Sequence, residues 1–196
     1  GLKYGWGFAP YDVVRIENPD THKVTYDSVN NHGWRDRDRS YYNKKKSFRV
    51  LVLGDSEVFG YIVPKEKTFT FLLEERFKKD GKNVEIINIA YSGWSTSQQL
   101  EALEKEALEY KPDLVIINFV GNDLFENVIH LDRSKFGSRI PFFHEIDATG
   151  ELKRYDNPRF DIEMKSITRQ YIISRFEILK RLWLVRLILK NQKRKE

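Results

Sequence analysis

The sequence predicts an α/β fold built on a parallel sheet, because three short apolar runs alternate with two segments of helical periodicity. The apolar runs are Phe48–Leu53, Val84–Ile89 and Leu114–Val120. Their branched aliphatic content and nearly unbroken apolarity are typical of strands that are covered on both faces of a sheet. Strand, helix, strand, helix, strand at this spacing makes two consecutive crossover units, which predicts that all three strands run parallel.

The two segments between these runs carry the spacing and the end signals of helices. The first shows an apolar stripe at helical intervals, formed by Phe69, Leu72, Leu73 and Phe77. Gly81 then stands where the C-terminal cap of this helix belongs. In the second segment Ser95 and Gln98 have the spacing of a capping box, and Pro112 follows the expected end.

The chain divides by pattern into three parts. Residues 1–47 are aromatic and polar without a clear period, so we expect an irregular lead-in with one hairpin around Val24–Val29. Residues 48–125 hold the predicted α/β core. Residues 126–196 are expected to form an insertion followed by an amphipathic basic helix.

Composition limits the possible function classes. The 196 residues suit one domain with a full core, and 40% hydrophobic residues are typical of a globular chain. The sequence holds no cysteine, which excludes disulfide scaffolds, thiolate metal sites and cysteine nucleophiles. No apolar run is long enough to cross a membrane, and the N-terminus does not resemble a signal peptide. Because the chain begins with glycine, we expect that residues upstream have been removed; the compartment stays undecided.

The net charge of +5 is concentrated at one end of the chain. Residues 165–196 hold ten Lys and Arg against two acidic residues, whereas residues 1–164 hold 24 basic and 27 acidic residues. The main body therefore lacks the basic surface that nucleic-acid binding requires, and no nucleic-acid partner is expected.

Polar residues follow each of the three predicted strands. Gly54-Asp55-Ser56 follows the first, Ser92-Gly93 follows the second, and Gly121-Asn122-Asp123 follows the third. In an open parallel sheet, ligands bind just beyond the carboxyl ends of the strands. Three polar clusters at three successive strand ends therefore predict one site at this edge of the sheet.

The residue types in these clusters suit acyl transfer. A serine at a strand-to-helix turn is an exposed nucleophile, and the glycine two residues before it lets the chain turn sharply. The tetrahedral intermediate needs oxyanion donors, which the N–H groups of Ser56 and Gly93 and the side-chain amide of Asn122 could supply. Asp55 would brace the turn, and Asp55 and Asp123 are the candidates for substrate-binding positions on the same edge. No metal or organic cofactor is implied.

Three motifs of this region resemble the SGNH, or GDSL-type, hydrolases. They are "GDSEVFG", "NIAYSGWSTSQQL" and "GND", and "NNHGWRD" and "VPKEKTF" are also similar to the start of that domain. The resemblance covers about residues 30–125 and implies a three-layer α/β/α, flavodoxin-like fold. By the resemblance, Ser56, Gly93 and Asn122 correspond to the Ser, Gly and Asn of the family.

One element of the family pattern is missing. The family places its catalytic histidine in an Asp-x-x-His block near the C-terminus of the domain. The residues three positions before the four histidines are Pro19, Val29, Asn127 and Pro141, and none is aspartate. We therefore expect that the sequence stops before the C-terminal half of the domain. His32 and His144 are expected to be structural or surface residues.

The function predicted from these features is hydrolysis of a carboxylic ester, such as an O-acetyl group on a carbohydrate. An acyltransferase that excludes water could use the same serine. A non-catalytic ligand-binding or interaction module is the alternative from another class, which the missing histidine favours and the Ser-Gly-Asn set opposes. Serines after strands can also be simple helix caps, and Asn-Asp pairs can be simple turns.

The segment 171–189 has two interpretations. One stripe of it is apolar, formed by Ile172, Phe176, Leu179, Trp183 and Leu187. The first interpretation is a helix that packs on another part of the domain or on a second copy, which makes self-association possible. The second is a basic helix that lies on a membrane surface.

Binding to lipid vesicles distinguishes the two interpretations of residues 171–189. The packing interpretation predicts dimers or larger species in light scattering, with Trp183 shielded from a fluorescence quencher. Salt-sensitive binding of a monomer to anionic vesicles would support the membrane interpretation instead. A monomer with a quenchable Trp183 and no vesicle affinity would contradict both.

Overall fold

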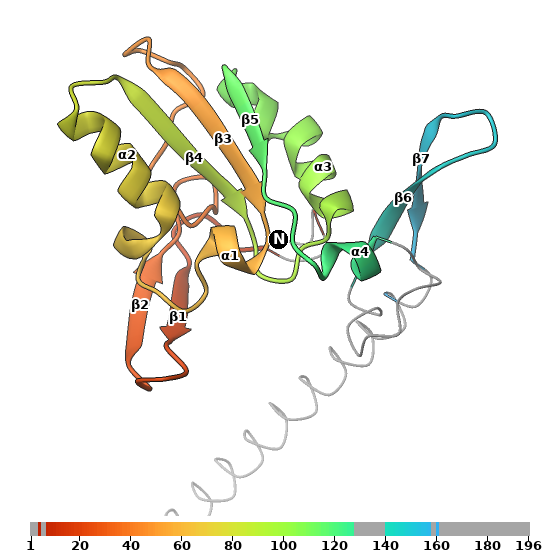
Figure 1. The fold of residues 1–196 in the computed structure, drawn as a ribbon, viewed down its shortest axis with the longest axis horizontal. Helices are drawn as coiled ribbons and strands as arrows, with labels where there is room; N and C mark the ends of the chain where they lie inside the picture. The colour runs from red at the N-terminus through yellow and green to blue at the C-terminus, as the bar shows by residue number, and fades with distance from the viewer. Residues whose placement is uncertain (1–3, 5–6, 128–139, 158–159, 161–196) are drawn as a thin grey trace, which may run out of the picture. The chain divides into compact units, whose positions relative to one another are not determined.

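A computed structural model describes Tyr4, residues 7–127, residues 140–157 and Phe160 (Figure 1). The chain divides into two compact units, residues 1–156 and residues 157–196. The predicted helix at 171–189 lies outside the described residues, as does His130. Within the described ranges, no helix combines the length and apolarity that crossing a membrane requires.

The first unit is built on a three-stranded parallel sheet, as predicted. Its strands are β3 (Phe48–Gly54), β4 (Val84–Ala90) and β5 (Leu114–Ile117), in the order β4-β3-β5. In the register, Leu51 lies between Ile87 of β4 and Val115 of β5. β5 ends three residues earlier than the sequence predicts. The backbone N–H of Val120 donates to the Asp123 carboxylate instead of continuing the ladder.

Each of the two long helices begins directly after a capping residue. α2 (Phe69–Lys79) is capped by Thr68, whose hydroxyl accepts from the Phe71 N–H. α3 (Thr96–Lys105) has the predicted Ser95–Gln98 capping box. Four short helical elements complete the set: α1 (Ser56–Phe59), the 3₁₀ turns η1 (Lys65–Lys67) and η2 (Ala107–Tyr110), and α4 (Asp123–Glu126).

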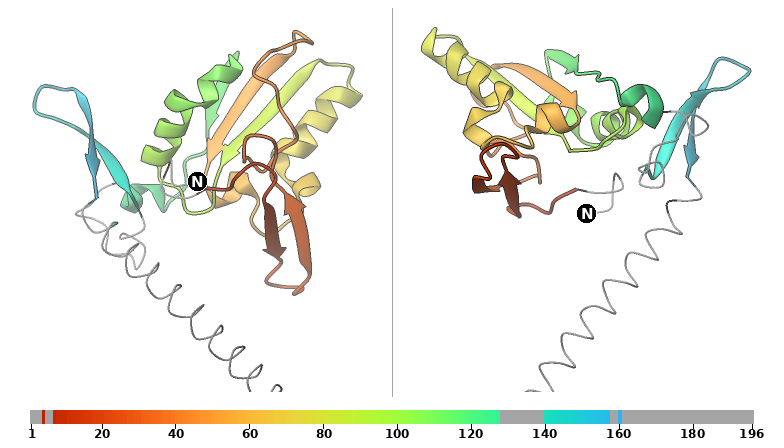
Figure 2. Two further views of the ribbon diagram at one scale, coloured as in Figure 1. Left: turned by 180° about the vertical axis from the view of Figure 1, so that it is seen from behind. Right: turned by 60° about the horizontal axis from the view of Figure 1, so that its bottom comes forward.

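The two long helices cover opposite faces of the sheet. The chain moves from β3 through α2 to β4 on one side, and then through α3 back across β3 to β5. Because such crossovers are right-handed, the two helices come to lie on opposite faces. Figure 1 and the view from behind in Figure 2 show α2 beside β4 and α3 beside β5. The strand order and the layers agree with the flavodoxin-like fold that the resemblance implied.

The lead-in has a regular start and packs into the same core as the sheet. β1 (Val13–Glu17) and β2 (Val24–Ser28) form an antiparallel hairpin, which extends the hairpin expected around Val24. The Trp34 side chain is 2% exposed and lies against two buried aromatic rings after β4, Tyr91 and Trp94. Residues that the sequence assigned to an irregular segment therefore build part of the hydrophobic core.

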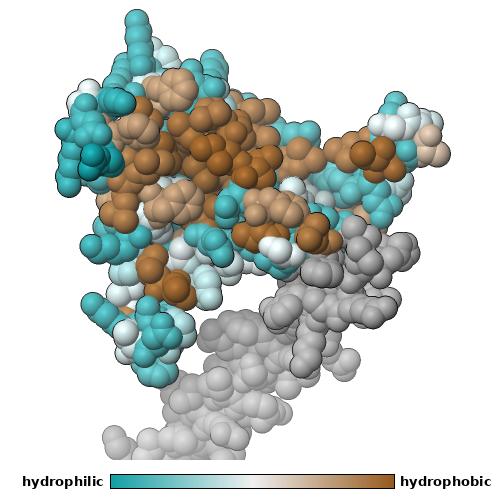
Figure 3. Space-filling model, viewed as in Figure 1, coloured by the Kyte–Doolittle hydropathy of each residue, from teal (hydrophilic) through white to brown (hydrophobic). Residues whose placement is uncertain are grey.

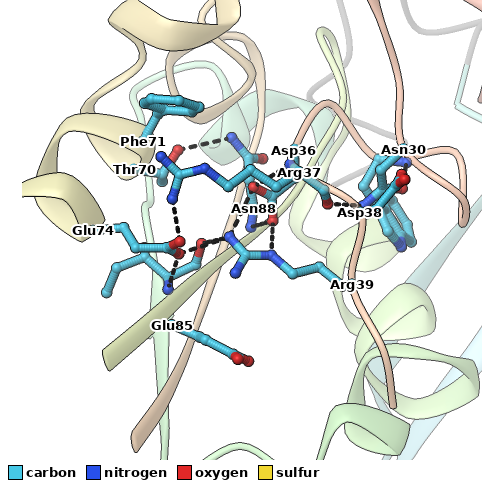
Figure 4. A network of polar contacts seen from close by, with 12 residues as sticks. Asn30, Asp36, Arg37, Asp38, Arg39, Thr70, Phe71, Glu74, Glu85 and Asn88 are labelled. Carbon is cyan, nitrogen blue, oxygen red and sulfur yellow. Dashed lines mark hydrogen bonds and ion pairs between the residues drawn. The ribbon is translucent and has the colours of Figure 1, made fainter. Parts of the chain in front are cut away.

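Side chains of the lead-in and of α2 satisfy the outer edge of β4 (Figure 4). The Glu74 carboxylate accepts from the Ile86 N–H at 2.7 Å, and the Arg39 guanidinium donates to the Ile86 carbonyl at 2.8 Å. Arg39 also donates to Glu74 at 2.7 Å and to Asp36 at 2.8 Å. Asp36 in turn accepts from the Asn88 N–H at 3.3 Å. An edge whose backbone groups are satisfied in this way is closed to further strands.

The outer edge of β5 is different, because the described residues offer no strand that pairs with it. Several apolar side chains of β5, of the loop after it and of α2 are largely exposed: Phe69, Leu72, Leu73, Leu114, Ile116, Ile117 and Phe119. Figure 3 shows a continuous apolar area over this face of the sheet. The apolar stripe that predicts α2 from the sequence is therefore mostly exposed to solvent. The buried residues of α2 are instead Thr70 and Glu74.

Residues 140–157 form a second hairpin, where the sequence predicts an insertion. β6 (Phe142–Ile146) pairs antiparallel with β7 (Leu152–Asp156). β6 contacts α3, and the Arg154 guanidinium of β7 donates to the buried Glu101 carboxylate of α3 at 3.0 Å.

Removing the Glu74 charge tests how far stability depends on the β4 edge. We expect Glu74→Gln to lower the free energy of unfolding by about 2–3 kcal/mol, because Arg39 and Arg37 each lose one carboxylate partner and the buried Ile86 N–H loses its charged acceptor. Glu66→Gln, at an exposed position, is the control and should change it by less than about 0.5 kcal/mol. Urea denaturation measures both. Equal effects in the two variants would show that the network contributes little.

The difference in unfolding free energy between the wild type and Glu74→Gln should become smaller as the pH falls. Burial raises the pKa of Glu74, but Arg39, the Ile86 N–H and Arg37 outweigh it, so the pKa of the carboxyl is lowered. A lowered pKa contributes stability above the unfolded-state value of about 4.3, and this stability is lost as the pH falls through the folded-state pKa. The gap between the wild type and Glu74→Gln should therefore narrow on acidification.

Candidate active site

The turn between β3 and α1 presents Ser56 at the carboxyl edge of the sheet. Asp55 caps α1 by accepting from the Glu57 N–H at 3.3 Å. A Cβ on Gly54 would lie 2.2 Å from a methyl of Val58, so only glycine lets the short helix pack this closely on the strand. Ser56 is half-buried, whereas Asp55 is 1% exposed. The local chain thus offers the serine to solvent and buries the acid behind it.

Asp55 joins the ends of β3 and β5. The side-chain amide of Asn122 donates to Asp55 Oδ2 at 3.1 Å. The Ser56 hydroxyl is directed to the same oxygen, with an O–O distance of 3.4 Å, which is long for a hydroxyl hydrogen bond. Ser56 and Asn122, predicted to lie together, therefore share one acceptor. The sequence had assigned Asp55 a bracing role but gave no sign that it would contact Asn122.

Gly93 lies in the loop that follows β4. Gly54 at the end of β3 pairs with Ala90 at the end of β4. Ser56 comes two residues after Gly54, and Gly93 comes three residues after Ala90, so both follow the same edge of the sheet. Gly93 is exposed and has φ +79°, a conformation that favours glycine. In the sequence it lies between Tyr91 and Trp94, whose side-chain rings are buried and have centroids 4.9 Å apart. These rings anchor a loop that turns sharply at Gly93.

Asp123 anchors the loop that carries Asn122. Its carboxylate accepts from the Val120 N–H at 2.9 Å and from the Thr96 hydroxyl at 3.2 Å. Asn127 extends the contact to α3, because its amide donates to the Thr96 hydroxyl at 3.0 Å. Burial raises the pKa of Asp123, and the nearby Asp55 adds to this shift. The loop after β5 is thus tied to the start of α3.

Both aspartates named as substrate-binding candidates are buried. Asp55 is 1% exposed and Asp123 is 0% exposed, and their described partners are groups of the chain itself. This geometry supports a positioning role for each. A contact of either carboxyl with substrate stays a prediction.

Of the three described histidines, His22 is exposed, whereas His32 and His144 lie in structural contacts. The His32 ring packs on Tyr41 at 4.4 Å between centroids, and its Nε2 lies 3.1 Å from the Arg39 carbonyl. His144 on β6 has its Nε2 3.7 Å from a Glu101 oxygen, and burial lowers its pKa. Within the described ranges, no histidine forms a hydrogen bond with Ser56. The same ranges contain no group of three His, Asp or Glu side chains suited to a metal ion.

Residues 52–140 match the model of the GDSL-like Lipase/Acylhydrolase family. The matched segment includes the end of β3, all of β4 and β5, and the three polar clusters at the carboxyl ends of these strands. Among curated proteins, an arylesterase of Vibrio mimicus is 39% identical over 77 residues, which is 39% of this chain and 38% of that protein.

Two solved structures are also similar over part of the chain. TesA is 31% identical, with a TM-score of 0.36 over 38% of this chain and 42% of that one. AlinE4, described as an SGNH-hydrolase family esterase, is 34% identical, with a TM-score of 0.36 over 40% of this chain and 43% of that one. The chain thus spans about two-fifths of the length of the relatives that it matches.

Replacing Asp123 tests whether this carboxylate holds the loop that carries Asn122. Asp123→Ala leaves the Val120 N–H and the Thr96 hydroxyl without their acceptor, so we expect the free energy of unfolding to fall by about 1–3 kcal/mol. Asp20→Ala, at an exposed turn position, is the matched control and should have little effect. Chemical denaturation with a tryptophan fluorescence signal measures both. An unchanged midpoint for Asp123→Ala would contradict the anchoring role.

Proposed function

Because residues 52–140 match the model of the GDSL-like lipase/acylhydrolase family, we propose that this protein is an ester hydrolase whose nucleophile is Ser56. The observation that carries the proposal is the meeting of Ser56 and Asn122 at Asp55 Oδ2, across two strand ends. Ser56 is half-buried and Asn122 exposed, so a substrate can reach both. A serine that served only as a helix cap would not require the Asn122 side-chain amide, from the loop after β5, beside it.

In the proposed reaction, Ser56 Oγ attacks the ester carbonyl carbon and the carbonyl oxygen becomes an oxyanion. The N–H groups of Ser56 and Gly93 and the amide of Asn122 donate to this oxyanion. Collapse of the tetrahedral intermediate releases the alcohol and leaves an acyl group on Ser56. A water molecule then attacks this acyl-enzyme and releases the carboxylic acid.

The reaction needs a base that takes the proton of Ser56 and returns it to the leaving alcohol. Asp55 is a poor candidate, because its oxygen lies 3.4 Å from Ser56 Oγ and already accepts from Asn122. We propose that a histidine outside the described residues fills this role, in the Asp-x-x-His block that the family resemblance implies. Such a histidine would approach from the solvent side of Ser56.

The proposed substrate class is a carboxylic ester with a small acyl group, including O-acetyl groups on carbohydrates. The exposed positions of Gly93 and Asn122 support it, because an open edge admits a bulky alcohol portion. An acyltransferase would form the same acyl-enzyme and pass the acyl group to an acceptor hydroxyl.

Hydrolysis of p-nitrophenyl acetate tests this proposal. The 196-residue chain is expected to be nearly inactive, because Ser56 keeps its proton when no base is present. A chain extended to include an Asp-x-x-His block should turn over. In that chain Ser56→Ala should abolish activity, and Asn122→Ala should lower kcat by about 10²–10³ because an oxyanion donor is lost.

Ser28→Ala, a serine of β2 that lies outside the proposed site, is the matched control and should leave kcat unchanged. Labelling of the extended chain by a fluorophosphonate provides a readout that does not need turnover. Strong labelling of Ser56 supports the nucleophile role. If Ser56→Ala kept full activity, or if the 196-residue chain were fully active through Ser56, the assignment of the nucleophile or of the missing base would be wrong.

A further inference from the structure

A hollow of about 560 Å³ lies at the amino-terminal ends of β3 and β4. Arg49 at the start of β3 and Val84 and Glu85 at the start of β4 form part of its wall. Ser56 follows the carboxyl end of β3, so the hollow lies at the opposite edge of the sheet. The family site therefore gives no role to this hollow.

Three of the four acidic side chains in the wall form ion pairs with arginines: Glu74, Glu75 and Glu85. Glu74 pairs with Arg39 at 2.7 Å and also with Arg37. Glu75 pairs with Arg37 at 2.7 Å. The two pairs of Glu74 belong to the network of Figure 4, in which Arg39 and Glu74 are each 8% exposed. The wall on this side is therefore both fixed in position and nearly neutral.

The same pattern recurs at the start of the strands. Glu85 pairs with Arg49 at 2.9 Å, and Arg49 is 2% exposed. Arg49 also donates to the Tyr110 carbonyl at 2.8 Å, which holds the guanidinium in place. The fourth acid, Asp38, accepts from the Asn31 N–H at 3.0 Å.

Four lysines of the wall carry positive charges in addition to those of the paired arginines. They come from three separate segments: Lys44 and Lys45 before β3, Lys78 near the end of α2, and Lys82 before β4. All four are exposed, and in the described part of the chain none forms an ion pair with an acid. Lys82 lies over the Phe77 ring, 5.8 Å from its centroid.

We propose that this lysine hollow binds an anion that carries phosphate groups. Lysine ammoniums are compact charges that bind phosphate well, and a group with two negative charges can meet several of them at once. A single carboxylate would leave most of the four charges unmatched. The ion-paired part of the wall is fixed, which lowers the cost of binding because it does not have to rearrange.

The phosphate could belong to a soluble metabolite or to a lipid headgroup. Both present the same chemistry to the four lysines. In either case the ligand would leave the Ser56 edge open, since the two sites are at opposite ends of β3. The inference does not rest on the proposed esterase activity.

Two probes test the proposal on the full chain: inorganic pyrophosphate by calorimetry, and vesicles of phosphatidylcholine with phosphatidic acid by co-sedimentation. The test variant carries Lys44→Gln, Lys45→Gln, Lys78→Gln and Lys82→Gln. The control carries Lys23→Gln, Lys67→Gln, Lys79→Gln and Lys111→Gln, which removes the same charge from exposed lysines outside the hollow. We expect the test variant to bind at least one probe about tenfold or more weakly than the control does.

Each outcome has one meaning. Selective loss of pyrophosphate binding supports a site for soluble phosphates, and selective loss of vesicle binding alone supports a headgroup site. Equal weakening in the two variants would show a general effect of charge and would overturn the proposal. Absence of binding of either probe to the wild type would also overturn it. Circular dichroism checks that both variants fold, and the pairs Lys44/Lys45 and Lys78/Lys82 can be replaced separately if they do not.

Discussion

The ion-pair network at the outer edge of β4 holds the parts of this fold together. Glu74 of α2 and Arg39 of the lead-in bind the N–H and carbonyl of the same residue, Ile86. One helix, one loop and one strand are thereby fixed by buried charges that are costly to separate. Because β4 pairs with β3 along its whole length, the position of the Ser56 turn depends on this edge.

The β4 edge and the β5 edge of the sheet differ in how far they are covered by side chains. The β4 edge is closed by side chains, whereas β5 and the face beside α2 expose a large apolar area. Exposed apolar areas of this kind mark surfaces that pack against something else. Ser56 follows the central strand β3, Gly93 follows β4 at the closed edge, and Asn122 follows β5 at the open edge.

The core elements could be predicted from the sequence because their signals are local. Apolar runs gave the three strands, and the Ser95–Gln98 pair gave the start of α3. The role of "RDRDR", residues 35–39, could not be predicted, since charges in a loop normally remain in solvent. Their partners lie far along the chain: Arg35 donates to the carbonyls of Phe59 and Gly60, and Arg39 binds Glu74. Only the tertiary fold shows that Arg35, Asp36 and Arg39 are buried.

The sequence predicted that Ser56 and Asn122 lie at one edge of the sheet, but it did not predict their link through Asp55. Parallel topology was enough to bring Ser56 and Asn122 to one edge, but no sequence pattern indicates that Asp55 accepts from both. This shared acceptor fixes the amide before any substrate arrives. Asp123 and the Tyr91–Trp94 pair fix the loops on either side in the same manner. Oxyanion donors are effective when they need not reorganise during the reaction. The described residues therefore hold Ser56 and Asn122 in fixed positions, as the proposed ester hydrolysis requires, and the proposed reaction still depends on another residue to remove the Ser56 proton.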